Sequence, residues 1–390
     1  MAEADTQYRA GRYVRQASHY SAFVPEPLPP TPPLKWDSEL QTLLSKADRA
    51  LGRLDGSIQT LPDPDLFVFM YVRKEAVLSS QIEGTQSSLN DLLEAEAAIS
   101  DSHRPSDVGE VLNYVNAMNH GLARLPELPI STRLIREIHE KLLAGVRGKR
   151  MSPGEIRRSQ NWIGPGGSSL NNAVFVPPPP HEVERLLSDL EKFIHSEEFI
   201  PPLVKIGLVH AQFETIHPFL DGNGRIGRLL ITFFLCQNEI LQKPVLYLSH
   251  YFKEHRQLYY ELLQKVRDEG AWEEWIKFFL QGVATVSLEA TETARAIVGL
   301  REAHRSIITD TFGRAAGNGL RILEGLYKRP YVTVSQIRDR LEISFPPASE
   351  LVRRFVEADI LVEVTGRERY RIYQYTPYIH LFSDPERRPI

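Results

Sequence analysis

The residues with the clearest chemical potential lie in one short segment, residues 217–228, which reads His-Pro-Phe-Leu-Asp-Gly-Asn-Gly-Arg-Ile-Gly-Arg. His217 has the intrinsic pKa of a general base, and Asp221 offers the hard carboxylate oxygen that Mg²⁺ prefers. Arg225 and Arg228 stand three positions apart, and such a pair suits a polyphosphate better than a single carboxylate. The segment therefore predicts an anion site with a base beside it.

The backbone of this segment supports the same hypothesis. An apolar run, residues 229–236, follows at once and predicts a helix that begins near Gly224. A helix N-terminus offers free N–H groups and the positive end of the helix dipole. Gly222 and Gly224 allow close approach of a ligand, and the N–H groups there can form a nest for phosphate oxygens. Each residue alone has an ordinary structural explanation, but the combination favours a phosphate site.

Helical periodicity dominates the chain on both sides of this segment. Asp107 and either Ser131 or Thr132 are candidate N-caps. The first 35 residues, polar and then proline-rich, predict an extended arm, and Gly and Asn turns over 150–180 predict an irregular hairpin or flap. We expect helices over residues 37–53, 65–82, 87–99, 108–123, 133–145, 182–196, 203–216, 224–238, 253–268 and 271–300.

The pattern changes after about residue 300. Helices are expected over 319–329, from Thr333 or Ser335 to Leu341, and over 348–358, followed by β-like runs at 360–364 and 369–375. Three helices and a hairpin outline a winged helix. This region could bind DNA through its arginines, but interleaved glutamates favour protein contact or dimerisation equally. The arginines are Arg353, Arg354, Arg367, Arg369 and Arg371.

Composition limits the class of protein. The chain has 390 residues, enough for two or three domains, and its 46 basic against 50 acidic residues give no overall basic footprint for nucleic acid or membrane. The single cysteine, Cys236, excludes an intrachain disulfide framework and is expected to be buried and inert. The absence of a long apolar stretch or a signal-peptide pattern favours a cytoplasmic protein without membrane contact.

Residues 217–228 match every fixed position of the pattern His-x-Phe-x-(Asp/Glu)-Gly-Asn-Gly-Arg-x-x-Arg, and the chain thereby resembles the Fic (Fido) family. The resemblance implies a mainly α fold: a Fic-type helical core with a short β-hairpin flap, an N-terminal helical region and a C-terminal winged helix. The expected domains are 1–109, an arm and helices; 110–285, the catalytic core; 286–318, a helical linker; and 319–390, the winged helix. The chain is also expected to form a homodimer.

Fic enzymes mostly transfer AMP from ATP to a protein hydroxyl group and release pyrophosphate. The resemblance implies that His217 deprotonates a Ser, Thr or Tyr hydroxyl of a target protein, which could be another part of the enzyme itself. It also implies that Asp221 holds Mg²⁺ and that Phe219 anchors the loop in the core. The implied nucleotide-binding residues are Gly222, Asn223 and Gly224 as the anion hole, Ile226 and Gly227 in the same turn, Arg225 and Arg228 on the β- and γ-phosphates, and Tyr259 by the adenine or ribose. An ordinary packing role for Tyr259 is an equal alternative.

Two further segments fit the family pattern. Residues 172–175, which are Asn172, Ala173, Val174 and Phe175, occupy the place of the flap that pairs with the target chain by β-augmentation. Residues 79–84 match the inhibitory pattern (Ser/Thr)-x-x-x-Glu-(Gly/Asn), which implies that Glu83 pairs with Arg228 in the space of the γ-phosphate. Asn161 and Trp162 receive no role. Three alternatives remain open: a nucleotide-sensing DNA-binding regulator, a donor other than ATP such as UTP or CDP-choline, and removal of AMP by water that Glu83 orients.

Overall fold

Two helices, α7 (Pro202–Ile216) and α8 (Asn223–Gln237), form the centre of the fold. The structure is a computed structural model and describes residues 8–59, 61, 64–97, 105–145 and 151–382. Every residue of α7 from Leu203 to Ile216 is buried, and most of α8 is buried too. Helices that are apolar on all faces must be covered on all sides. The loop between them carries the His217 segment, so this loop is held from both ends by the core.

The expected helices of the N-terminal and central regions are present with shifted ends. Before α7 these are α1 (Ser38–Gln59), α2 (Pro64–Ile82), α3 (Leu89–Glu96), α4 (Val108–Arg124), α5 (Thr132–Leu142) and α6 (Pro180–Ile194). The end of the helix expected over 87–99 lies partly outside the described residues. Of the candidate caps, Ser131 is confirmed, because its side chain accepts from Leu134 N. Asp107 precedes α4 but makes no capping bond; its carboxylate accepts from Gln86 N at 2.7 Å instead.

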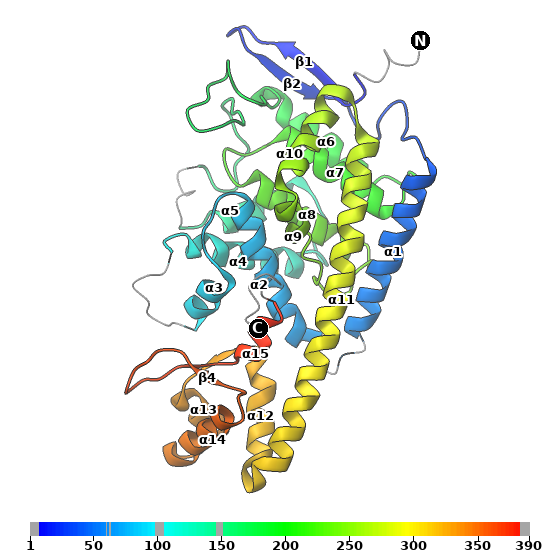
Figure 1. Cartoon of the computed structure of the whole chain (residues 1–390). Helices are drawn as coiled ribbons and strands as arrows, with labels where there is room; N and C mark the ends of the chain where they lie inside the picture. The colour runs from blue at the N-terminus through cyan, green and yellow to red at the C-terminus, as the bar shows by residue number, and fades with distance from the viewer. Residues whose placement is uncertain (1–7, 60, 62–63, 98–104, 146–150, 383–390) are drawn as a thin grey trace.

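The helices after α8 differ more from expectation. The single helix expected over 253–268 is two, α9 (Ser249–Glu254) and α10 (Arg256–Glu269), with His255 between them. The next helix, α11 (Trp272–Thr311), does not end near residue 300 as expected. It is 40 residues long and ends at Thr311. It packs against α1 over part of its length and continues past α1 to link the core to the C-terminal region (Figure 1). The helix ends just before Gly313, whose positive φ of 56° does not continue an α-helix.

The N-terminal arm is more regular than its composition suggests. It contains an antiparallel hairpin of β1 (Gly11–Arg15) and β2 (Ser21–Pro25), where an extended arm was expected. Phe23 N in β2 donates to Val176 O at 2.9 Å, which joins the hairpin to the flap region. Arg9 forms a two-bond ion pair with Glu273 of α11, at 2.9 and 3.0 Å. The arm is therefore fixed to the helical core at two places.

The C-terminal region contains η2 (Gly313–Ala315), α12 (Ala316–Leu326), β3 (Tyr331–Val332), α13 (Val334–Leu341), α14 (Phe345–Glu357), β4 (Val362–Glu363), β5 (Tyr373–Gln374) and α15 (Thr376–His380). The strands form an antiparallel sheet in the order β3-β5-β4. Thr333 caps α13 through a capping box with Gln336. Sequence reasoning missed the two-residue β3. It also placed the start of α14 too late, because it put the two prolines before the helix, whereas prolines are compatible with the first turn of a helix. The winged-helix assignment stays a prediction.

The end of the described chain returns to α2. The ring of Phe382 meets that of Tyr71 edge-on, with centroids 5.4 Å apart, and the Tyr71 hydroxyl donates to Ala290 O in α11 at 2.9 Å. In Figure 1, α15 lies close to the lower end of α2. Among the described residues, no helix combines the length and apolar character that crossing a membrane requires.

Candidate active site

The loop between α7 and α8 is a closed, rigid turn. His217 ends α7 in the left-handed conformation with φ 47°, and Gly222 has φ 79°. The Asn223 side chain bridges the turn: its Oδ1 accepts from Phe219 N at 2.8 Å, and its Nδ2 donates to Phe219 O at 2.9 Å. The side chain of Asn223 is thus occupied within the loop. Only its backbone N–H remains for an anion, together with those of its neighbours at the start of α8.

A histidine that sequence reasoning missed supports the loop from below. The ring of His139 in α5 stacks on Phe219, with centroids 3.7 Å apart and planes 9° apart. Its Nδ1 accepts from Gly154 N at 2.8 Å, so its Nε2 carries the hydrogen that is donated to Asp221 O at 3.0 Å. Burial lowers the pKa of His139 to about 4, which keeps the ring neutral. Phe219 itself is fully buried and lies where a core anchor was expected.

Arg157 and Asn161 hold the same loop from the flap side. Buried Arg157 donates from Nε to His217 O at 2.9 Å and from Nη2 to Pro178 O at 2.6 Å. Asn161 Nδ2 donates to Phe219 O at 2.9 Å and to His217 O at 3.4 Å. Neither role was found from the sequence, since Asn161 was left unassigned and Arg157 lies in a segment without periodicity. These two side chains fix the backbone position of the candidate base.

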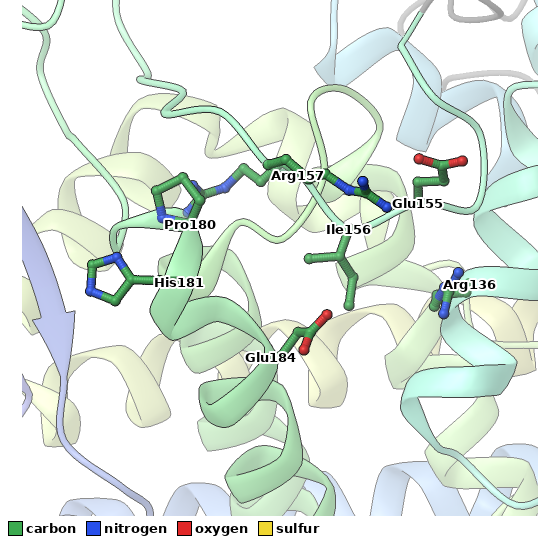
Figure 2. A pocket seen from close by; sticks show the side chains of 8 residues that line it. Arg136, Glu155, Ile156, Arg157, Pro180, His181 and Glu184 are labelled. Atoms are coloured by element: carbon green, nitrogen blue, oxygen red, sulfur yellow. The ribbon is translucent and has the colours of Figure 1, made fainter.

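Arg157 also separates the loop from an open groove of about 640 Å³ on the surface. Figure 2 shows that the groove is lined by residues of the segment before the flap, with Pro180, His181 and Glu184 from α6 and Arg136 from α5. Arg136 is already engaged, because its Nε donates to Gly154 O at 2.7 Å. The groove therefore lies behind the His217 loop, outside the pocket that the loop faces.

The pocket that His217 faces has a volume of about 540 Å³. Burial, together with the positive charges of Arg157 and Arg267, lowers the pKa of His217 to about 3. Its Nδ1 is buried and has no hydrogen-bond partner among the described residues. A neutral imidazole beside a cavity can accept a proton. The pocket is lined by Glu83, Trp162, Ile163, Gly164, Pro165, Val174, Phe175, Glu214, His217, Gly224, Arg228, Arg256, Tyr259, Tyr260, Leu263, Gln264 and Arg267.

Asp221 and Arg225 stand together at the start of α8. Arg225 is buried and faces Glu110 at 3.4 Å and Asp221 at 3.6 Å, both too long for strong pairing. The Asp221 side chain is 47% exposed, and one of its oxygens accepts from Gly222 N. Within the described part of the chain, no three His, Cys, Asp or Glu side chains form a metal-binding group. One exposed carboxylate fits a cation that takes the rest of its ligands from phosphate oxygens and water, as Mg²⁺ does.

Arg228 is bonded to residues of α2 and of the turn after it. Its Nε donates to Ser79 Oγ at 2.8 Å, and its Nη2 donates to Ser79 O at 2.9 Å and to Glu83 Oε1 at 2.7 Å. The Glu83 carboxylate lies against Gly224, where a Cβ would collide with it. Burial opposes ionisation of Glu83, but Arg228 outweighs it, and the net effect lowers the pKa of Glu83. The expected Glu83–Arg228 ion pair is present, and its carboxylate lies over the first turn of α8.

Tyr259 and Tyr260 line the pocket in different ways. Tyr259 is only 1% exposed, and its hydroxyl donates to Nε2 of His210, whose Nδ1 donates to Gly227 O, each at 2.9 Å. Tyr260 is 39% exposed. Tyr259 therefore forms the buried wall of the pocket, and its contacts resemble the ordinary packing role that was the alternative to nucleotide binding. Tyr260 presents the more accessible ring, and sequence reasoning did not single it out.

The flap is an irregular hairpin held by a single bridge. Ile163 and Phe175 exchange backbone hydrogen bonds of 2.8 and 3.1 Å. The Phe175 ring is buried under the Arg267 guanidinium, 3.8 Å from its centre. Val174 is 61% exposed, whereas Asn172 Oδ1 accepts from Ser169 N at 2.6 Å. Of the four expected target-binding residues, Phe175 is an inward-facing anchor, and residues 172–174 remain available at the rim.

Comparison with known proteins agrees with this geometry. Residues 41–123 match the model of the Fic/DOC family N-terminal region, and residues 129–235 match the model of the Fic/DOC family. A protein adenylyltransferase Fic of Drosophila yakuba is 29% identical over 250 residues, 62% of this chain and 46% of the relative. One of Aedes aegypti is 31% identical over 204 residues, 50% of this chain and 37% of the relative. The chain thus spans about half or less of the length of these curated relatives.

A solved structure shows the same fold. The crystal structure of a Fic family protein from Desulfovibrio desulfuricans G20 superposes with a TM-score of 0.57 at 18% identity, covering 88% of this chain and 97% of that one. At this identity the likeness concerns the fold alone. With both family models matched and the His217 loop at the centre of this fold, the chain belongs to the Fic/DOC family.

Proposed function

We propose that the chain is a protein adenylyltransferase that transfers AMP from ATP to a Ser, Thr or Tyr hydroxyl of a protein and is restrained by Glu83. One observation carries the proposal: a neutral His217, the N-terminus of α8 and Arg228 border a single pocket of about 540 Å³. A base, an anion site and a cation in one cavity are the groups that this reaction requires. The names of the curated relatives support the same activity.

In the proposed reaction, His217 takes the proton of the target hydroxyl as its oxygen attacks the α-phosphorus of ATP. The new P–O bond forms as the bond to the bridging oxygen of the β-phosphate breaks, and pyrophosphate leaves. The charge of bound ATP raises the low pKa of His217 and makes it a better base. Backbone N–H groups at residues 222–224, with Arg225 and Arg228, would counter the negative charge of the phosphates. The imidazolium then returns its proton to solvent.

Asp221 is the residue that would hold Mg²⁺, since its exposed carboxylate lies at the N-terminal end of α8. When bound, the ion supplies positive charge to the phosphates beside the reacting centre. Residues 172–174 at the rim of the flap would align the target chain by strand-like pairing. The backbone of Phe175 is not available for this pairing, because it is already used in its bridge to Ile163.

Glu83 would act as a brake by occupying the place of the γ-phosphate. Arg228 cannot pair fully with both anions, and the Glu83 carboxylate already takes the space above Gly224. ATP would then bind only in an unproductive position while Glu83 is in place. A role of Glu83 in orienting water for AMP removal is compatible with the same geometry.

Incubation of the Glu83→Gly protein with α-labelled and γ-labelled ATP tests the proposal. Transfer of α-label alone, abolished by His217→Ala, is the expected result. Transfer of γ-label alone would indicate a kinase, and transfer of neither with any candidate protein would support a nucleotide sensor. Mass spectrometry with ATP, UTP and CDP-choline supplied in turn identifies the donor. Homodimerisation and DNA binding stay predictions.

A further inference from the structure

The C-terminal end of α2 is held by two arginines of the nucleotide pocket, not by one. A helix leaves its last four carbonyl groups without partners inside the helix. In α2 the middle two of these are satisfied locally by the turn that follows: Ser80 O accepts from Glu83 N and Thr85 N at 3.0 and 3.2 Å, and Gln81 O accepts from Gly84 N at 3.1 Å. The other two carbonyls need outside donors.

Both outside donors are guanidinium groups that line the pocket. Ser79 O accepts from Arg228 Nη2 at 2.9 Å, and Ile82 O accepts from Arg256 Nε at 3.2 Å. Cations at a helix C-terminus are also favoured by the helix dipole. Arg256 is the first residue of α10 and borders the same cavity as Glu83, Gly224 and Arg228. The bond to Ile82 therefore holds the residue immediately before Glu83.

Arg256 keeps capacity for a second partner. Arg256 is an exposed residue, its guanidinium carbon lies 5.5 Å from the centre of the Tyr260 ring, and only its Nε takes part in the hydrogen bond to α2. An arginine offers five N–H donors in one plane, so two-point contact with a phosphate remains open to it. A polyphosphate in the place of the Glu83 carboxylate would lie in a cavity that both Arg228 and Arg256 border.

We propose that Arg256 is a shared residue of the brake and of the nucleotide site: it holds the end of α2 through Ile82 while Glu83 is in place, and it binds the terminal phosphates of ATP once Glu83 is displaced. This inference rests on the proposed function. It implies that ATP competes with the whole last turn of α2, through two arginines. Glu83→Gly alone removes the ion pair with Arg228 and leaves both carbonyl attachments in place, Arg228 to Ser79 O and Arg256 to Ile82 O.

The test combines Arg256 variants with both states of the brake. In the Glu83→Gly background, we expect Arg256→Ala to weaken ATP binding about tenfold, the effect of losing a charged hydrogen bond, and to raise KM with kcat little changed. AMP binding, measured by the same calorimetric titration, should be unchanged because AMP lacks the terminal phosphates. Arg256→Lys should recover part of the ATP affinity, whereas the uncharged Arg256→Gln should not. With Glu83 present, Arg256→Ala should raise basal adenylylation a few-fold.

The matched control is Gln257→Ala, the next residue of α10, whose side chain donates to Glu261 of its own helix and to no other side chain of the described residues. An ATP affinity of Arg256→Ala within twofold of the control, in the Glu83→Gly background, would overturn the phosphate role. A basal rate that does not rise in the Glu83 background would overturn the role in the brake. Direct titration with ATP tests the phosphate role of Arg256 even if no protein is modified. A failure of the proposed transferase activity is therefore distinguished from a failure of this inference. Unfolding temperatures of all variants exclude a general loss of structure.

Discussion

Glu83 Oε1 lies 2.7 Å from Arg228 Nη2, although 145 residues separate the two in the sequence. The pair depends on the rotation of α2 about its axis, because Ser79 and Glu75 lie one and two turns before Glu83 on the same face. Glu75 is buried and accepts from Ser249 Oγ and Tyr114 at 2.5 and 3.1 Å. These contacts fix the rotation of the helix about its axis, so a buried polar stripe, and not Glu83 alone, sets the position of the Glu83–Arg228 pair.

Replacement of Glu83 should release the brake in proportion to the charge that is lost. We expect Glu83→Gly to raise the initial rate of adenylylation about tenfold or more, and Glu83→Gln to give an intermediate rate, since it keeps a hydrogen bond without the charge. Because the pKa of Glu83 is lowered, its contribution to the closed state is present above the ordinary value of 4.5 and is lost only as pH falls below that value. The relief should therefore persist unchanged from pH 6 to 8 in rate assays with α-labelled ATP. Equal rates for wild type and Glu83→Gly would exclude the brake.

Arg157 should matter for both stability and catalysis. Arg157→Ala leaves the buried carbonyls of His217 and Pro178 without these donors, and we expect the free energy of unfolding to fall by about 2–4 kcal/mol. Misplacement of His217 should lower kcat about tenfold or more, with a smaller change in KM for ATP. Chemical denaturation and steady-state rates measure the two effects. Exposed Arg158, the next residue, is the control; an equal loss in Arg158→Ala would show that the effect is not specific to the loop.

His139 should make folding sensitive to acid. Its pKa is lowered from 6.5 to about 4, so below pH 6.5 the unfolded chain binds a proton that the native state does not. Stability is therefore lost as pH falls from 6.5 towards 4, by about 1.4 kcal/mol per pH unit for one such group. The buried carboxyls Glu75 and Glu214, whose pKa burial raises to about 7, act in the opposite direction. Comparison with His139→Gln isolates the effect of the histidine. Between pH 5 and 6, the free energy of unfolding of the variant, measured by urea denaturation, should change with pH by about 1.4 kcal/mol per unit less than that of the wild type. An unchanged slope would mean that His139 is protonated in the native state.

Asp221 should be needed for activity and not for folding. Its side chain is half exposed, so Asp221→Asn should change the free energy of unfolding by less than about 0.5 kcal/mol. Loss of a metal-holding charge should reduce the rate about 100-fold or more in the Glu83→Gly background. Chelation of divalent cations should have the same effect, reversed by added Mg²⁺. Full activity of Asp221→Asn in the presence of chelator would remove Asp221 from the site.

The sequence predicted the local structure around His217 from consecutive residues, and it missed the contacts that distant segments make with this loop. The position of the His217 loop before α8 followed from glycine turns and an apolar run, and the Glu83–Arg228 ion pair followed from a short pattern. His139, Arg157 and Asn161 were missed because each acts by bonding to backbone atoms of the loop, and any residue type with a donor or acceptor could have done so. The same reason explains Arg256, whose partner is a carbonyl group. Similarly, β1 and β2 were not predicted, because they lie in a polar arm and pair chiefly with each other.

The arginines of α14 should contribute little to DNA binding. Arg353 pairs with Glu350 and with Glu357, and Arg354 pairs with Glu350 and donates to Phe312 O. Hydrogen bonds from the two arginines lower the pKa of Glu350 to about 2, so these charges cancel on the helix face over the whole physiological range. We expect Arg353→Gln to leave the affinity for random duplex DNA unchanged within twofold in gel shifts between 50 and about 200 mM salt, where phosphate contacts are strongly salt-dependent. Glu350→Gln is the matched variant. It should strengthen any binding of duplex DNA in the gel shift, because it frees both arginines from their ion pairs with Glu350. A marked loss of binding in Arg353→Gln, with a shallower salt dependence, would show instead that α14 exchanges its glutamates for phosphates and lies against the duplex.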